Sequence, residues 1–250
     1  MSVTHVLVAS IVSGLVALTV LGTVAVRWSL CRTFPLYLIA CFVGSVLVIL
    51  WPERFWTPEF YALKETVYGG LQMAVALELA VVILGRFPRA LTRVLLRFIA
   101  VLTVGAIVAA VPRPGYFQAL TLGLPLEQAC VSWMFMILVF AVIWHRIPLG
   151  TYHRAVLGGF AFYVGTFTLL LGMTAAFGWA AFTLCLQTID PVAFAATVGV
   201  WAASAWRKDE EVVPPPDLLN FSTWRRRPLI LASEVLALIL VFGIIWAHAS

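Results

Sequence analysis

Long runs of apolar residues, separated by short polar stretches, repeat along the whole chain. A transmembrane helix needs roughly 20 apolar residues, because it rises ~1.5 Å per residue and the hydrocarbon core of a bilayer is about 30 Å thick. The apolar segment 177–188 is shorter and is interpreted as a loop or an interfacial piece. We predict eight spans, at residues 6–26, 35–51, 60–84, 94–111, 124–144, 155–176, 191–206 and 229–247.

The predicted fold is an all-α membrane protein, a heptahelical transmembrane bundle plus one additional C-terminal transmembrane helix. Residues 1–206 form the seven-helix bundle, residues 207–228 a cytoplasmic linker rich in proline and basic residues, and residues 229–250 the eighth helix. Composition supports this fold, because 63% of the 250 residues are hydrophobic and only 11% are charged. Soluble domains carry about 25% charged residues, so a soluble globular protein is excluded.

Basic residues indicate how the chain is threaded. With the N-terminus outside, the cytoplasmic connections hold thirteen of the sixteen lysines and arginines: Arg27, Arg32, Arg86, Arg89, Arg93, Arg97, Arg146, Arg154, Arg207, Lys208, Arg225, Arg226 and Arg227. This asymmetry follows the positive-inside rule, and it places both termini outside. Since the basic residues follow the span ends rather than one surface stripe, the predicted partner is the lipid bilayer and not a nucleic acid.

The third span begins with a helix-start signal. Thr57 is a typical capping residue, and it is followed by Pro58 and an acidic residue in the first turn. A helix from Pro58 to Leu84 has 27 residues and is ~40 Å long, which is longer than the bilayer requires. The outer boundary then lies close to Glu65, and the neighbouring Lys64 can extend its ammonium group outward.

A polar stripe runs along the same helix. Tyr61, Glu65, Tyr68 and Gln72 share one face by their i, i+4, i+7 and i+11 spacing. Such a stripe points at another helix or at a wet vestibule rather than at lipid. Two interpretations remain open: a ligand-binding site that also includes Lys64, or a polar packing seam with an interfacial ion pair.

Glu78 lies deeper, six residues before Leu84. A charged carboxylate at such a depth costs on the order of 3 kcal/mol, so it must be protonated, paired or wet. Its candidate partners at a similar depth are Trp201, Ser204, Arg97 and Arg27. A proton or cation relay through Glu78 is one functional hypothesis.

Two other acids have simple structural interpretations. Glu127 follows Pro125, which predicts the first turn of the fifth span, where the helix dipole favours an acid. Asp190 precedes Pro191, which predicts a capping residue at the start of the seventh span. Neither residue is expected to carry a function.

The remaining residue patterns predict packing rather than chemistry. Ala195, Gly199 and Ala203 repeat every four residues, the spacing of a close helix contact. Cys130 and Cys185 lie toward the same side, so a disulfide is one option and two free thiols the other. The four histidines are split between the two sides and no catalytic motif is present, so we expect no metal, no cofactor and no enzyme activity.

The spacing of Glu65 and Glu78 on one helix, the "LPLEQ" run around Glu127 and the "WRKDEE" segment resemble an uncharacterised family of bacterial seven-helix integral membrane proteins. The resemblance covers about residues 1–211 and implies a seven-helix fold in the bacterial inner membrane. No activity is established for that family, so the resemblance implies no catalytic residues. The proline-rich linker and the eighth helix are additions to its pattern.

Three functional classes follow from these observations. The first is a non-enzymatic sensor or receptor-like protein, which binds a small ligand near the polar stripe and signals through a separate cytoplasmic partner. The second is a transporter or channel with Glu78 as its relay. The third is a structural subunit that assembles with other membrane subunits. We expect the first class.

Overall fold

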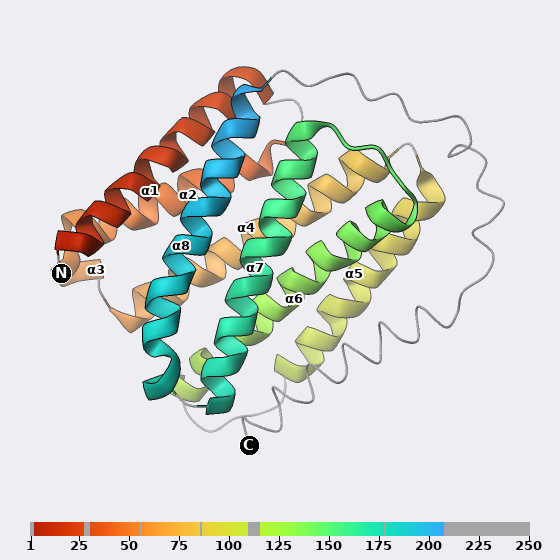
Figure 1. Ribbon diagram of the computed structural model, residues 1–250. Helices are drawn as coiled ribbons and strands as arrows, with labels where there is room; N and C mark the ends of the chain where they lie inside the picture. Colours follow the sequence, from red (N-terminus) through yellow and green to blue (C-terminus); the bar gives the residue numbers. More distant parts are fainter. Residues whose placement is uncertain are drawn as a thin grey trace.

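The computed structural model describes residues 3–27, 31–55, 57–85, 87–109, 116–177 and 179–207, and all regular structure within them is helical (Figure 1). The long helices are α1 (Val3–Gly22), α2 (Thr33–Leu50), α4 (Pro58–Leu84), α5 (Pro88–Ala109), α6 (Tyr116–Trp144), α7 (Thr151–Phe177) and α8 (Trp179–Trp206). A π-helical turn, η1 (Thr23–Arg27), extends α1, and the short helix α3 (Pro52–Phe55) precedes α4.

Six of these helices, α2 and α4 to α8, are long and apolar enough to cross a membrane, and α1 contributes a shorter apolar stretch, Ser10–Val26. The chain is therefore a multi-pass membrane protein. The predicted eighth helix, and the linker beyond Arg207, lie outside the described residues.

Six helices surround a common interior. α1 packs against α2 and α8, α2 against α4, α4 against α6, α6 against α7, and α7 against α8, so that these contacts close into a ring. α5 packs on the outside of this ring against α4 and α6. In Figure 1, α8 lies between α1 and α7. The first and the last described helices are therefore neighbours in space, although they are far apart in the sequence.

Aromatic side chains fill the middle of the ring. Phe160 of α7 lies at the centre, with ring centroids 4.7 Å from Phe135 of α6 and 4.7 Å from Trp201 of α8. On its other side it contacts α2, at 5.8 Å from Phe34 and 5.1 Å from Tyr37. Phe160 therefore connects α2 with the three consecutive helices α6, α7 and α8, and we call these five residues the aromatic core.

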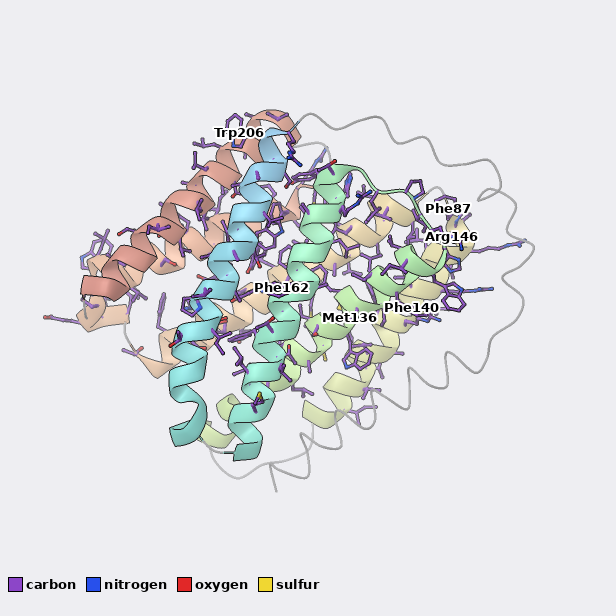
Figure 2. All side chains as sticks on the ribbon, in the orientation of Figure 1. Phe87, Met136, Phe140, Arg146, Phe162 and Trp206 are labelled. Atoms are coloured by element: carbon purple, nitrogen blue, oxygen red, sulfur yellow. The ribbon has the colours of Figure 1, made fainter. Side chains whose placement is uncertain are left out.

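Apolar side chains also cover the outside of the bundle. Met136 and Phe140 on α6 and Phe162 on α7 are exposed, although they are large and hydrophobic (Figure 2). A soluble protein rarely exposes so many such residues in one band. The exposed apolar surface is consistent with contact with lipid.

Two helices begin earlier than the sequence predicts. The expected loop at 177–188 is wrong, because α8 starts at Trp179 and passes through Asp190 and Pro191 without a break. The expected helix start near Pro125 is also wrong, because α6 starts at Tyr116, although its part that is apolar enough to cross a membrane, Pro125–Trp144, agrees with the predicted fifth span. Proline is tolerated inside membrane helices, where neighbouring groups can satisfy the carbonyl that loses its donor.

The start of α4, by contrast, is where the sequence predicts it. Thr57 has the extended backbone of a capping residue, and its hydroxyl accepts a hydrogen bond of 3.2 Å from the Phe60 amide. The helix then runs from Pro58 to Leu84 over 27 residues. This length places Glu65 and Glu78 at opposite ends of one rigid element.

Most of the described arginines lie at one end of the bundle, which we call the arginine end. It is formed by the start of α2, α5 and α7 and by the end of α4, α6 and α8, and it holds Arg32, Arg89, Arg93, Arg97, Arg146, Arg154 and Arg207. Arg146 is the second residue after α6 and lies beside the start of α5 (Figure 2). Lys64 and Arg54 lie toward the opposite end.

Candidate functional site

The polar stripe of α4 faces α2. The Tyr68 hydroxyl lies 3.2 Å from the carbonyl oxygen of Ala40 and 3.4 Å from that of Cys41, and it donates to them. Gly44 of α2 leaves the space that this hydroxyl needs, because a side chain there would collide with it. One turn deeper, the Gln72 amide nitrogen donates to the Tyr37 hydroxyl over 3.2 Å.

Lys64 and Glu65 form the predicted ion pair. The ammonium nitrogen lies 3.2 Å from a carboxylate oxygen, and both side chains are mostly buried. The same ammonium also lies over two aromatic rings, 5.1 Å from the centroid of Tyr61 and 5.5 Å from that of Tyr68. A carboxylate and two ring faces together stabilise a cation that is partly removed from water.

Glu127 joins this group from α6, and its predicted place in a first helical turn is wrong. It is the twelfth residue of α6, counted from Tyr116, which places it ~16 Å along the helix. Its carboxyl group packs directly on Gly69 of α4, where a side chain would displace it. From this position it interacts electrostatically with Glu65.

Asp190 joins the group from α8, and its predicted capping role is wrong as well. It is the twelfth residue of α8, counted from Trp179, at the same depth as Glu127 in α6. It shares a side-chain hydrogen bond with Tyr163 of α7 and interacts electrostatically with Glu65 and Lys64. Its Oδ1 atom is buried and has no hydrogen-bond partner among the described residues.

These residues form one polar cluster, contributed by five helices. We define the cluster as Tyr37, Lys64, Glu65, Tyr68, Gln72, Glu127, Tyr163 and Asp190. At its deepest point Gln72 is 3% exposed, and its Oε1 atom finds no partner in the described part of the chain. Tyr37 belongs to both the polar cluster and the aromatic core, so the aromatic core closes the cluster toward the arginine end.

Of the predicted ligand residues, Lys64, Glu65, Tyr68 and Gln72 come together in this cluster. Tyr61 contributes its ring to Lys64 but is 44% exposed, so it lies at the edge. Among the described residues, no three histidine, cysteine, aspartate or glutamate side chains are close enough to share a metal ion. The three carboxyl groups therefore act on a common region without converging on one point.

Glu78 is separate from the cluster, and its role is structural. It lies thirteen residues beyond Glu65 on α4, ~20 Å along the helix. Its carboxylate accepts hydrogen bonds from the Arg32 amide at 2.8 Å and from the Thr33 amide at 2.7 Å. The Thr33 hydroxyl donates over 2.5 Å, and the Cys31 thiol donates over 3.2 Å.

Glu78 thus caps the N-terminus of α2 from another helix. The first backbone amides of a helix have no partner within it, and they carry the positive end of the helix dipole. Burial and the adjacent carboxylate raise the pKa of the Cys31 thiol to about 12, so the thiol keeps its proton and remains a donor. These four hydrogen bonds account for the carboxylate in the described structure.

Of the partners expected for Glu78, Trp201 and Ser204 are wrong, Arg97 is not among the four donors, and the Arg27 side chain lies outside the described residues. The Trp201 indole donates instead to the carbonyl of Ala155 over 3.0 Å, and the Ser204 hydroxyl donates to the carbonyl of Trp201 over 2.8 Å. All four donors to the Glu78 carboxylate come from residues 31–33, which favours a capping role over a proton or cation relay.

The small-residue stripe of α8 does not make the predicted close contact within the described residues. A Cβ atom added at Gly199 would meet nothing within 4 Å, and Ala203 is exposed. The close approach lies at Gly159 of α7, on which the Trp201 indole packs. Cys130 is a buried free thiol, and the Cys185 side chain lies outside the described residues.

Comparison with known proteins adds no relative: no protein-family description, no curated protein and no solved structure matches this chain. The resemblance to a bacterial seven-helix family therefore stays a prediction. The residues of the site have to be argued from their own geometry.

Four residues of the cluster were not predicted as site residues: the tyrosines Tyr37 and Tyr163 and the acids Glu127 and Asp190. Glu127 lies two residues after Pro125 and Asp190 directly precedes Pro191, and a proline close to an acid is also the pattern of a helix start. A signal was nevertheless present in the apolar residues before each proline. Because these residues extend the helices to 29 and 28 residues, the acids fall well inside them.

Proposed function

We propose that the protein is a non-enzymatic, sensor- or receptor-like membrane protein that binds a small ligand in the polar cluster. The supporting observation is the cluster itself: carboxyl groups from three helices lie within electrostatic reach of one another, and the buried Gln72 has an oxygen without a partner among the described residues. A bundle built only for packing gains little from such groups, because each polar group buried without a partner costs about 1–3 kcal/mol.

The orientation that fits this proposal follows from the arginine end. With seven spans in the bundle, an eighth C-terminal span and the N-terminus outside, the arginine end faces the cytoplasm of a bacterial cell. The polar cluster then lies in the outer half of the inner membrane. The linker after α8 would carry the response to a cytoplasmic signalling partner.

The aromatic core favours binding over passage. It fills the middle of the ring between the polar cluster and Glu78, with rings 4.7 to 5.8 Å apart. A ligand that enters the cluster from the outer side meets this core and stops there. The transporter and the structural subunit have no comparable observation in their favour.

Native mass spectrometry on protein extracted directly from its membrane tests the proposal. We expect a bound small molecule on the wild type that is lost from Glu65→Gln and Gln72→Leu. The control is Glu53→Gln, which removes an exposed acid on α3 at the same end. If no molecule is bound, or if the cluster variants retain it as well as the control does, the proposed function is wrong.

A further inference from the structure

The charges of the polar cluster do not balance among the described residues. Three carboxyl groups, from Glu65, Glu127 and Asp190, face one ammonium group, from Lys64. Lys64 is already engaged by Glu65 at 3.2 Å. Glu127 and Asp190 are within electrostatic reach of Glu65, so the three acids share one neighbourhood. Two carboxyl groups thus remain for a cation that the described chain does not supply.

The surroundings of Lys64 show which kind of cation the cluster accommodates. The Lys64 ammonium lies between a carboxylate and the faces of Tyr61 and Tyr68, at 5.1 and 5.5 Å from the two ring centroids. Carboxylates together with aromatic faces are the usual surroundings of an alkylammonium group in proteins. The side chain of Lys64 is itself an alkylammonium of this type.

Two buried acceptors point to the same chemistry. Gln72 lies two turns after Glu65 on the same face of α4, and its Oε1 atom has no donor among the described residues. The Oδ1 atom of Asp190 on α8 also lacks a donor among the described residues. A buried acceptor without a donor is costly, so both positions favour a ligand that carries N–H groups.

The spacing of the acids argues for an extended ligand. Glu127 comes from α6 and Asp190 from α8, and these helices are separated in the ring by α7. The carboxyl groups do not converge closely enough to hold one metal ion together. Glu127 and Asp190 thus reach the cluster from opposite sides of α7, and a ligand that neutralises both carries two positive charges.

We infer that the ligand of the polar cluster is an extended organic dication, of the diamine class, with one ammonium group at Glu127 and the other at Asp190. Its N–H groups satisfy the buried acceptors, and its methylene chain lies against the tyrosine rings. This inference rests on the proposed function, and it adds the chemical class of the ligand.

The direct test is the binding of labelled 1,5-diaminopentane to the full-length protein in nanodiscs of phosphatidylcholine, whose net charge is zero. Unlabelled diamines with three to eight carbons compete for the site, and pentylamine, sodium and magnesium ions serve as comparisons. We expect an optimum chain length and a roughly tenfold or greater advantage of the diamine over pentylamine, since the second ammonium adds a charge-assisted contact. Equal competition by pentylamine, or no binding, overturns the inference.

Variants locate the two ends of the ligand. Glu127→Gln and Asp190→Asn keep the size of each side chain but remove its charge. Each should weaken diamine binding roughly tenfold and change the affinity for pentylamine by no more than about threefold. Glu53→Gln serves as the control. If both cluster variants bind diamine as the wild type does, the inference is wrong. Melting curves without ligand show whether each variant is folded, and the wild-type chain-length series does not depend on them.

The two proposals fail in different ways. If diamines do not bind but native mass spectrometry finds another molecule that depends on Glu65 and Gln72, the dication is wrong and the ligand-binding function stands. The same absence of diamine binding is expected if Glu127 and Asp190 are protonated, because neutral acids do not attract a cation. If neither experiment finds a ligand, both proposals are overturned.

Discussion

Glu78 and the polar cluster show two ways of keeping acids inside one membrane bundle. At the arginine end, Glu78 accepts hydrogen bonds from Cys31, Arg32 and Thr33, and all of these donors belong to the start of α2. Toward the other end, Glu127 and Asp190 face Glu65 and leave acceptors without donors in the described structure. Depth in the membrane therefore does not identify a functional acid, whereas the identity of its partners does.

The largest expected effect on stability is at Glu78. Glu78→Ala removes the cap of α2 and leaves two amides, a hydroxyl and a thiol without their acceptor, so we expect a loss of about 2–4 kcal/mol in stability. Glu78→Lys should be worse, because it places a cation against the positive end of the helix dipole. Melting in detergent and the yield of inserted protein measure both effects.

Glu78→Gln provides the matched variant, because it can still accept from one amide through its carbonyl oxygen. Its loss of stability should lie between that of the wild type and that of Glu78→Ala. If Glu78→Lys were as stable as the wild type, the carboxylate would not be the cap of α2, and its separation from the polar cluster would lose its basis.

Two neighbouring glycines of α4, Gly69 and Gly70, provide a matched pair of variants beside the polar cluster. A methyl group at Gly69 collides with the Glu127 carboxyl group, whereas one at Gly70 meets nothing within 4 Å. Gly70→Ala should raise stability by up to ~1 kcal/mol through helix propensity alone. Gly69→Ala has the same propensity gain but must push Glu127 aside.

We therefore expect Gly69→Ala to weaken diamine binding roughly fivefold to tenfold, with Gly70→Ala close to the wild type. Equilibrium binding in nanodiscs and melting curves provide the two readouts. Equal binding by both alanine variants would mean that the placement of Glu127 does not matter to the ligand.

These two regions also differ in how far the sequence predicts them. The order of the spans, the cap at Thr57 and the ion pair of Lys64 with Glu65 follow from local patterns: apolar runs, a capping residue and a charge near a boundary. The partners of Glu78 do not, because the donors lie 45 to 47 residues away in the chain. No local pattern encodes which helix end meets a given side chain.

The polar cluster was half predictable for the same reason. Glu65, Tyr68 and Gln72 lie on one helix, so their spacing alone reveals a shared face. Glu127 and Asp190 come from other helices, and each lies within two residues of a proline that also signals a helix start. Only the packing of α6 against α4 and of α8 against α7 brings these acids to the same depth as Glu65.

Tyr68 tests whether the polar stripe is a seam or a site. Tyr68→Phe removes the hydroxyl that donates to the carbonyls of Ala40 and Cys41 but keeps the ring over Lys64. We expect a loss of ~1 kcal/mol, or about 2–4 °C in melting temperature. The control, Tyr61→Phe, removes the hydroxyl of a residue that is 44% exposed, and it should leave the melting temperature unchanged.

Ligand binding distinguishes the two interpretations of this result. If the stripe is only a seam with α2, Tyr68→Phe lowers stability while the affinity for diamine stays the same. If the ring faces the ligand as it faces the Lys64 ammonium, Tyr68→Leu should weaken diamine binding by several-fold more than Tyr68→Phe does. The same affinity in both variants would remove the aromatic wall from the site.

The smallest expected effect lies at the arginine end, in His145, which directly follows α6. Burial and the nearby guanidinium groups of Arg93 and Arg97 lower the pKa of His145 from its ordinary value of 6.5 to about 4. Between pH 6.5 and 4 the unfolded chain therefore binds a proton that the folded protein does not, so stability is full above pH 6.5 and falls as the pH decreases through this window.

His145→Gln should flatten this decrease, which melting curves at pH 7.5, 6 and 5 measure. The acids of the polar cluster contribute to acid stability in both proteins, so the difference between the two curves isolates the arginine end. A variant that keeps the full pH slope would show that the surrounding arginines do not hold His145 neutral. The positive potential at this end would then be weaker than the packing of Arg93 and Arg97 indicates.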